Sequence, residues 1–215
     1  MTTDLEREKR LAAEAAAKLA EAGMTVGLGT GTTAGYFLEA LAARDLDVRC
    51  VATSPATEAA AKGLRLRVER FDDDQLTRLD LAVDGADQIA ANGWVVKGNG
   101  GAHTREKVVA AAAARFVVIA SSDKIVERVS SPIPIELLVF GHAATLERLA
   151  HARLRDAPPT ADGGVLADWI GPLDDLASLA GLLSATPGVV DHGLFPPELV
   201  SERLVGRGDD VERIA

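Results

Sequence analysis

The sequence is poor in cysteine and contains no long apolar run. Cys50 is the only cysteine among 215 residues, so no disulfide can form within the chain, and its mostly apolar neighbours predict a buried, unreactive thiol. No apolar run reaches the roughly 18 residues of a membrane-spanning helix, which predicts a protein that does not bind a membrane. The first residues, MTTDLEREKR, are charged and no apolar stretch follows them, so we expect no secretory signal and a cytoplasmic location.

Basic clusters and metal-binding motifs are also missing. The 23 basic and 32 acidic residues give a net charge of -9, and no group of Lys and Arg stands out, so we expect no nucleic-acid partner. The sequence has no HExxH or CxxC pattern and its four histidines are scattered, which predicts no metal site. An apolar content of 47% is that of an ordinary globular protein, with one large domain or a medium domain and a small companion.

Short apolar runs alternate with helical patterns over the first 130 residues or so. The expected strands lie at 24–28, 47–52, 64–71, 79–83, 94–96 and 115–121, and the expected helices lie at 3–20, 33–43, 56–62 and 103–114. This alternation predicts a parallel α/β sheet. The nearly continuous apolar character of the strands agrees with a sheet that is covered on both faces.

The order of the elements changes after about residue 130. Three strands are expected at 132–140, 164–169 and 188–195, and two helices at 142–152 and 173–185, which together make a small α+β unit. We therefore expect two domains. Residues 1–130 and about 196–215 form the larger, catalytic domain, and residues from about 131 to 195 form the smaller one.

A loop rich in glycine and threonine follows the first expected strand. From Gly27 to Thr33 it reads Gly-Leu-Gly-Thr-Gly-Thr-Thr, and the start of the next helix offers N–H groups to an anion. Counted from Gly27, the dinucleotide-binding pattern GxGxxG is not satisfied, because Thr32 stands in its last position. Counted from Gly29, its last position is Ala34, and alanine is permitted there. Thr-Ser-Pro follows the second strand, without the acidic residue that would hold a ribose, so the loop suits a single phosphate. A plain strand–helix turn with a threonine cap is the alternative.

Three further polar clusters lie after expected strands or at the start of a helix. Asp84-Gly-Ala-Asp87 could direct two carboxylates to one site, or could form an ordinary Asx turn. Lys97 and the glycines after it could project an ammonium into a pocket, or could form a flexible hairpin. Glu106, in Thr-Arg-Glu-Lys, could be a base, or a first-turn carboxylate favoured by the helix dipole. Because ligands of an open α/β sheet bind at the carboxyl ends of its strands, these clusters together indicate a site at that edge.

The segments VGLGTGTTA, VDGAD and KGNGGAHTREK, in this order and spacing, resemble the type A ribose-5-phosphate isomerases. Ser-Asp-Lys at 122–124 and PGVVDHGLF at 187–195 extend the resemblance over most of the chain. It implies a Rossmann-like α/β domain with a smaller, ferredoxin-like α+β domain, usually in a homodimer or homotetramer. It also implies a sugar phosphate as the small-molecule substrate, with no metal and no organic cofactor.

The resemblance also implies a role for each cluster. Glu106 would move a proton between C1 and C2 through an enediolate, and Lys97 would stabilise the negative charge that develops on the carbonyl oxygen. Asp84 and Asp87 would handle hydroxyl groups during ring opening and proton transfer. Such an isomerisation needs a base that both takes and returns a proton, and a cation or donors at the enediolate oxygen. The substrate-binding residues would be Thr30, Gly31, Thr32, Thr33, Asp84, Gly85, Ala86, Asp87, Lys97, Gly98, Asn99, Gly100 and Lys124.

The chain departs from the family pattern at a few positions. Gln88 stands where the family usually has Glu, Asn99 interrupts a glycine run, and His103 replaces an apolar residue. We expect His103 to make local hydrogen bonds, and we expect these changes to affect substrate preference more than activity. The alternatives are a non-catalytic sugar-phosphate sensor and an enzyme for another sugar phosphate, such as an amino-sugar phosphate deaminase. Glu106 is present, the first helix is too little for a DNA-binding helix-turn-helix, and we find no deaminase motif.

Overall fold

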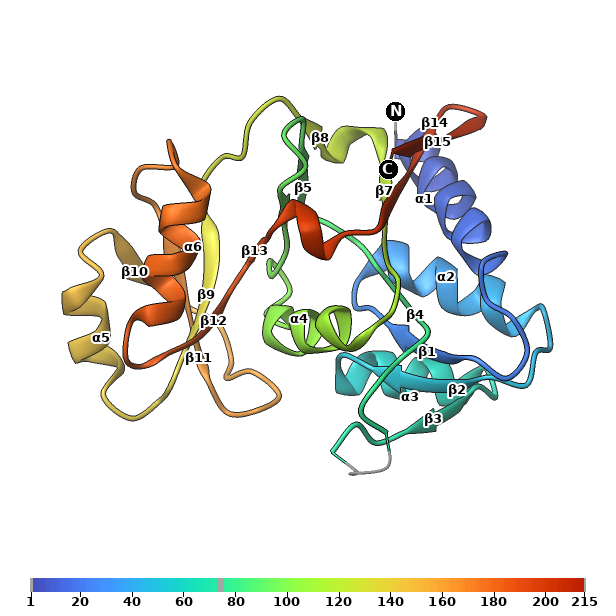
Figure 1. Ribbon diagram of the computed structural model, residues 1–215, viewed down its shortest axis with the longest axis horizontal. Coiled ribbons are helices and arrows are strands. Elements are labelled where there is room, and N and C mark those ends of the chain that lie inside the picture. The colour runs from blue at the N-terminus through green and yellow to red at the C-terminus, as the bar shows by residue number, and fades with distance from the viewer. Residues whose placement is uncertain (1, 73–75, 215) are drawn as a thin grey trace. The chain divides into compact units, whose positions relative to one another are not determined.

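The computed structural model describes residues 2–72 and 76–214, and the chain divides into two compact units (Figure 1). Within the described residues, the first unit contains the chain up to Ala86, Arg105–Ile125 and the chain from Glu198 onward. The second unit contains Asp87–Thr104 and Val126–Pro197. Residues 87–104 therefore group with the second unit, whereas the expected division had placed them in the larger domain. The expected domain boundaries stay a prediction.

The first unit is built on a seven-stranded sheet with the strand order β15-β14-β7-β4-β1-β2-β3. All neighbouring strands pair in parallel except β14 and β15, which are antiparallel. The predicted Rossmann-like parallel sheet is thus confirmed. The strands are β1 (Thr25–Leu28), β2 (Arg49–Ala52), β3 (Arg67–Glu69), β4 (Leu81–Asp84), β7 (Phe116–Ser121), β14 (Glu202–Arg207) and β15 (Asp210–Ile214).

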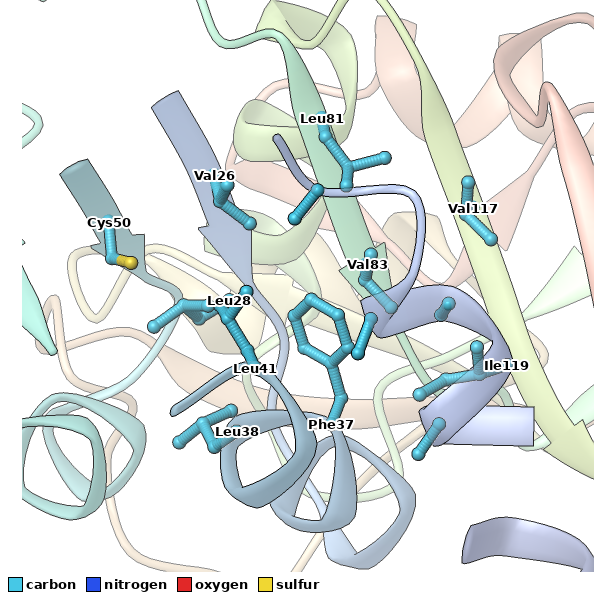
Figure 2. Packing of buried hydrophobic residues seen from close by; sticks show 14 of the residues in the cluster. Val26, Leu28, Phe37, Leu38, Leu41, Cys50, Leu81, Val83, Val117 and Ile119 are labelled. Carbon is cyan, nitrogen blue, oxygen red and sulfur yellow. The ribbon is translucent and has the colours of Figure 1, made fainter. Parts of the chain in front are cut away.

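One face of this sheet packs against an apolar cluster. The helices of the unit are α1 (Thr2–Ala17), α2 (Thr32–Ala42), α3 (Pro55–Gly63) and the greater part of α4 (His103–Ala112). Figure 2 shows Phe37 and Leu41 of α2 against Leu28 and Val83 of the central strands. Burying each large side chain of this kind contributes about 1.5–3 kcal/mol. Cys50 lies in the same cluster, so the predicted burial of its thiol is confirmed, and this burial raises the pKa of the thiol to about 12.

Helix α4 covers the opposite face of the sheet. Val26 and Leu28 point into the apolar cluster, so Gly27 between them faces the other way. A Cβ on Gly27 would overlap Cγ1 of Val109 in α4 and would lie 3.0 Å from the Cβ of Ala82. The glycine therefore lets the helix approach the sheet closely.

The second unit holds the β-α-β-β-α-β order of ferredoxin-like folds. Its antiparallel sheet has the order β10-β11-β9-β12. The elements are β9 (Ile133–Leu137), α5 (His142–Arg148), β10 (Ala152–Leu154), β11 (Val165–Trp169), α6 (Leu176–Ala185) and β12 (Val189–His192). The sequence had not indicated β10, which contains only three residues.

A second four-stranded sheet has the order β13-β6-β5-β8. It consists of β13 (Leu194–Phe195), β6 (Val95–Val96), β5 (Gln88–Ala90) and β8 (Ile125–Val126). The remaining elements are two short 3-10 helices, η1 (Ser122–Lys124) and η2 (Pro197–Leu199). Strand β6 leads directly into Lys97, and β13 pairs with it. None of the helices within residues 2–72 and 76–214 is long and apolar enough to cross a membrane.

Candidate active site

The strand order reverses between β1 and β4. Strands β2 and β3 continue the sheet on one side of β1, and β4, β7 and β14 continue it on the other. In open α/β sheets, ligands bind outside the carboxyl ends of the strands at this switch point. The Thr30–Thr33 loop follows β1, Asp84 ends β4, and η1 with Lys124 follows β7. Three neighbouring strands thus bring these predicted site residues to one edge of the first unit.

The loop after β1 begins α2 without a side-chain cap. Gly31 is the N-cap residue, at φ 115°, and no side chain accepts from the first turn. This φ lies in the region that favours glycine. Thr32 and Thr33 follow as the first helical residues, where the N–H groups of a helix have no intrahelical acceptor. The geometry therefore suits an anion at the start of α2.

The hydroxyl of Thr30 belongs to a buried network of hydroxyl groups. Its oxygen lies 2.8 Å from Oγ1 of Thr53 and 3.1 Å from Oγ1 of Thr57. Thr53 donates its proton to the carbonyl of Leu28, and Thr57 donates to that of Gly29. Either hydroxyl could be the donor in each contact with Thr30, so the network holds the Thr30 side chain in place without fixing the direction of its proton.

Asp84 is 3% exposed and fixes the turn between β4 and the loop. Its Oδ1 accepts hydrogen bonds from the backbone N–H groups of Gly85 (2.7 Å) and Thr30 (3.1 Å). A Cβ on Gly29 would overlap the Asp84 carboxyl group and would lie 2.6 Å from its Cα. A Cβ on Gly85 would lie 3.9 Å from the Cβ of Thr33. The Asp84 turn and the threonine loop are therefore in direct contact.

Glu106 lies in α4 and is 5% exposed. Ala113, just after α4, bridges to Leu79, just before β4, so the helix begins toward the carboxyl ends of the strands and ends toward their amino ends. Glu106 precedes Val109, which faces Gly27, by three residues, or about 4.5 Å of rise. Glu106 therefore lies further along the helix toward the carboxyl ends of the strands than Val109 does.

Glu8 of α1 holds the turn that carries Lys124. The Glu8 carboxylate accepts from the N–H (2.8 Å) and hydroxyl (2.6 Å) of Ser122 and from the N–H of Gly208 (2.9 Å). Burial alone would raise the pKa of Glu8, but these hydrogen bonds outweigh it and hold the pKa below its usual value. Lys124 is about one-third exposed, with its Nζ 3.3 Å from Oδ2 of Asp123.

Lys97 lies in the second unit and is 3% exposed. Its ammonium is 5.8 Å from the centroid of the Phe195 ring, within the range of a cation–π interaction. Its backbone N–H donates to the carbonyl of Gly193 at 2.9 Å. The late PGVVDHGLF segment thus contributes directly to the surroundings of the lysine.

The loop after Lys97 is fixed from two sides. The Asp87 carboxylate accepts from the N–H of Asn99 at 2.9 Å. Gly98, at φ 106°, packs against His103, and a Cβ there would lie 2.6 Å from the histidine Nδ1. His103 is fully buried, so its ring occupies the interior position that an apolar residue would otherwise fill. Asn99 and Gly100 are exposed, so they present the surface of the loop.

Gln88 uses both ends of its amide group. Its Nε2 donates to the carbonyl of Ser130 at 2.8 Å, and its Oε1 accepts from the Ser130 N–H at 2.8 Å. A carboxylate at this position could accept but could not donate. The departure at Gln88 therefore has a local structural reason.

A family model of ribose 5-phosphate isomerase A, also called phosphoriboisomerase A, matches residues 49–210 of the chain. The chain belongs to the ribose 5-phosphate isomerase A family. Members of this family are aldose–ketose isomerases, and the chain is an enzyme of that kind.

Individual members of the isomerase family match nearly the whole chain. Ribose-5-phosphate isomerase A of Caulobacter sp. (strain K31) is 44% identical over 96% of this chain and 97% of the relative. The structure of the enzyme from Methanocaldococcus jannaschii is 30% identical with a TM-score of 0.89, covering 96% of this chain and 97% of that one. A D-ribose-5-phosphate isomerase solved with phospho-erythronic acid is also 30% identical, with a TM-score of 0.91 and 98% of both chains covered.

Several residues that hold the predicted site loops in place carry no recognisable sequence signal. Thr53 and Thr57 had been interpreted only as the end of a strand and the start of a helix. Arg155 and Asp168, described below, lie far from the motifs in the sequence. Within the part of the chain that the structure describes, no group of three or more His, Cys, Asp or Glu side chains could hold a metal ion.

Proposed function

We propose that the protein interconverts D-ribose 5-phosphate and D-ribulose 5-phosphate through an enediolate, with Glu106 as the base. The observation that supports this proposal is the buried Glu106 carboxylate in the first turn of α4, a helix that packs against Gly27 of β1. The relative solved with phospho-erythronic acid, a phosphorylated sugar acid, supports a substrate of this class.

Glu106 would carry the proton between the two carbon atoms. In the open-chain aldose it removes the proton from C2, and the electron pair moves toward the C1 aldehyde to give the enediolate. The same carboxyl group then returns the proton to C1, while the proton of the O2 hydroxyl passes to O1, so the product is the ketose. No atom is gained or lost, and one group serves in both half-reactions.

Charged side chains would stabilise the intermediate and handle its hydroxyl groups. Lys97 supplies a compact positive charge, and burial strengthens its effect on a developing oxyanion. Asp84 and Asp87 accept hydrogen bonds from substrate hydroxyls during ring opening and proton transfer. Lys124 and the loop from Lys97 to Gly100 contact the substrate.

The loop after β1 would bind the phosphate group. The N–H groups and hydroxyls of Thr32 and Thr33, with the adjacent Gly31, can surround one phosphate at the start of α2. Thr30 supports the loop through Thr53 and Thr57. Gly85 and Ala86 line the adjacent turn.

An NMR assay of the purified protein with ribose 5-phosphate, in the absence of added metal, tests whether the protein catalyses this reaction. Ribulose 5-phosphate should form, with exchange of solvent deuterium into the transferred position. Glu106→Gln should keep the fold and bind substrate but lose about 10²–10⁴-fold in turnover. Near wild-type turnover of this variant would exclude Glu106 as the base, even if the reaction itself is observed.

We further propose a cytoplasmic homodimer or homotetramer. The second unit exposes a run of apolar side chains, Leu138, Val139 and Phe140, and Phe140 is 92% exposed. Apolar groups gathered on a surface favour association. The charged substrate cannot cross a membrane unaided, so the enzyme should act in the compartment where sugar phosphates are made. Light scattering of the purified protein and fractionation of cells test the two statements.

A further inference from the structure

Arg155 follows β10 in the second unit and connects two parts of the chain that are far apart in sequence. Its Nη1 donates to the backbone carbonyls of Gly98 (3.2 Å) and Asn99 (3.1 Å). Its Nε donates to Oδ2 of Asp168 at 2.9 Å, and Nη2 donates to Oδ1. The two charged side chains are 17% and 21% exposed. A largely buried, bidentate pair is therefore aimed at the loop that follows Lys97.

Asp168 orients the guanidinium group. The planar fork of an arginine matches a carboxylate with two parallel hydrogen bonds, and this fixes the direction of the remaining N–H groups. Asp168 is on β11 and its backbone position is set by pairing with β9 and β10. Because Asp168 also neutralises the charge of Arg155, the arginine is better suited to hold carbonyl groups than to bind a phosphate.

Two of the contacts to this loop meet on a single peptide group. The Gly98 carbonyl and the Asn99 N–H belong to the same peptide plane. Arg155 donates to the carbonyl side, and the Asp87 carboxylate accepts on the N–H side. A cation and an anion on opposite sides favour one orientation of this plane. Gly98 has φ 106° and no side chain of its own, so these charged contacts add to the packing against His103 in fixing the orientation of the peptide.

We propose that Arg155 is a positioning residue that locks the Gly98–Asn99 peptide and thereby fixes the loop from Lys97 to Gly100 in its working conformation. The inference rests on the proposed role of this loop in the isomerisation. Arg155 acts through the loop and does not touch the substrate. Loss of the guanidinium lets the peptide plane turn, which displaces the groups of the loop relative to the substrate.

Arg155→Met tests the inference against a matched control. Arg153 lies two residues earlier, in β10, and donates to the carbonyls of Ala150 and Ala152, so Arg153→Met removes an equivalent charge without touching the loop. We expect Arg155→Met to lower kcat/KM about tenfold to hundredfold, since displacement of a reacting group by about 1 Å costs this much. Arg153→Met should remain within about twofold of the wild type.

Two further measurements separate positioning from a loss of folding. In ¹⁵N-labelled protein without substrate, the Asn99 amide signal should shift and exchange faster with solvent in Arg155→Met, but not in Arg153→Met. Asp168→Asn keeps the size of the side chain but removes its negative charge and one of the two acceptors for Arg155, and should change the same signal in the same direction by a smaller amount. This variant keeps the test decisive if Arg155→Met does not fold.

The outcomes distinguish this inference from the proposed function. If the wild type turns over ribose 5-phosphate and Arg155→Met matches it, with an unchanged Asn99 signal, the inference is wrong while the function stands. If the Asn99 signal moves and turnover does not, the arginine orders the loop but does not position it for catalysis, which also overturns the inference. If the wild type shows no turnover, the proposed function fails and takes with it the catalytic role proposed for Arg155.

Discussion

Gly29→Ala is the substitution whose effect follows most directly from the packing of the site. The added Cβ would overlap the Asp84 carboxyl group and would lie 2.6 Å from the Asp84 Cα. Rotation of the Asp84 side chain cannot relieve the second contact, because it involves the backbone. The ends of β1 and β4 must therefore separate by about 0.8 Å or more to reach an ordinary carbon–carbon contact of about 3.4 Å.

This separation affects activity more than stability. Overpacking in a well-packed region costs about 1–3 kcal/mol of the free energy of unfolding. The same shift pulls Thr30 away from the Asp84 carboxylate, and a displacement near 1 Å can cost about 10²-fold in rate. We therefore expect Gly29→Ala to remain folded at 25 °C but to lose about two orders of magnitude in kcat/KM for ribose 5-phosphate.

Gly35→Ala is the matched control. Gly35 lies six residues further on in α2, and an added Cβ would meet no atom within 4 Å. Alanine is favoured over glycine within a helix by about 0.5–1 kcal/mol, so this variant should be as active as the wild type and slightly more stable. Urea unfolding and steady-state kinetics of both variants provide the comparison. Wild-type activity in Gly29→Ala, at unchanged stability, would refute the argument from close packing.

Three other perturbations test separate parts of the site. Thr32→Val should raise KM for ribose 5-phosphate about tenfold to hundredfold, with a smaller fall in kcat, because a hydrogen bond to a charged phosphate contributes about 1.5–3 kcal/mol in both ground and transition states. An equal loss on unphosphorylated ribose would contradict a phosphate-binding role. EDTA should leave activity unchanged, because Lys97 supplies the cation, whereas Lys97→Arg should be poorly active, because a broad fork cannot replace a point charge in a tight loop. Restoration of chelated enzyme by one divalent metal would argue against this. Glu8→Gln should cost about 1.5–3 kcal/mol of stability at pH 7. The pKa of Glu8 is lower in the folded state than its usual 4.5, so its contribution is present above about pH 4.5 and is lost as the pH falls through the folded value. Urea unfolding at pH 7 and pH 3.5 should show the difference between variant and wild type narrowing at the lower pH, and a constant difference would rule out the charged hydrogen bonds as its source.

Much of the fold could be predicted because its central strands are apolar on both faces. Strands β1, β4 and β7 are buried at every position, and such runs are recognisable in the sequence. Strand β14 was not expected, although it is also almost entirely buried. Its Glu202 and Arg203 interrupt the apolar pattern, and Glu202 is compensated by Arg115 and Arg213, which lie elsewhere in the chain.

In the candidate site, too, the residues within continuous motifs could be predicted, whereas contacts between distant segments could not. Motifs such as Asp84–Asp87 are continuous in sequence, so the resemblance to known isomerases identified them directly. The Thr30 network joins residues 23 and 27 positions apart, and Arg155 reaches carbonyls 57 and 56 positions away. No local pattern encodes such contacts, because they form only when the sheets bring distant segments together.

Strand β15 has a further consequence for the behaviour of the protein in solution. It is the outermost strand beside β14, whose Leu204 and Val205 are almost fully buried. An uncovered strand edge offers a row of backbone donors and acceptors to any other chain, and charged side chains discourage such pairing. Asp210, Glu212 and Arg213 place exposed charges on β15, with ion pairs from Glu212 to Arg207 and from Arg213 to Glu202. The charges on β15 should therefore discourage pairing with strands of other molecules. Removal of β15 would expose the apolar β14 as an edge strand that is prone to aggregation.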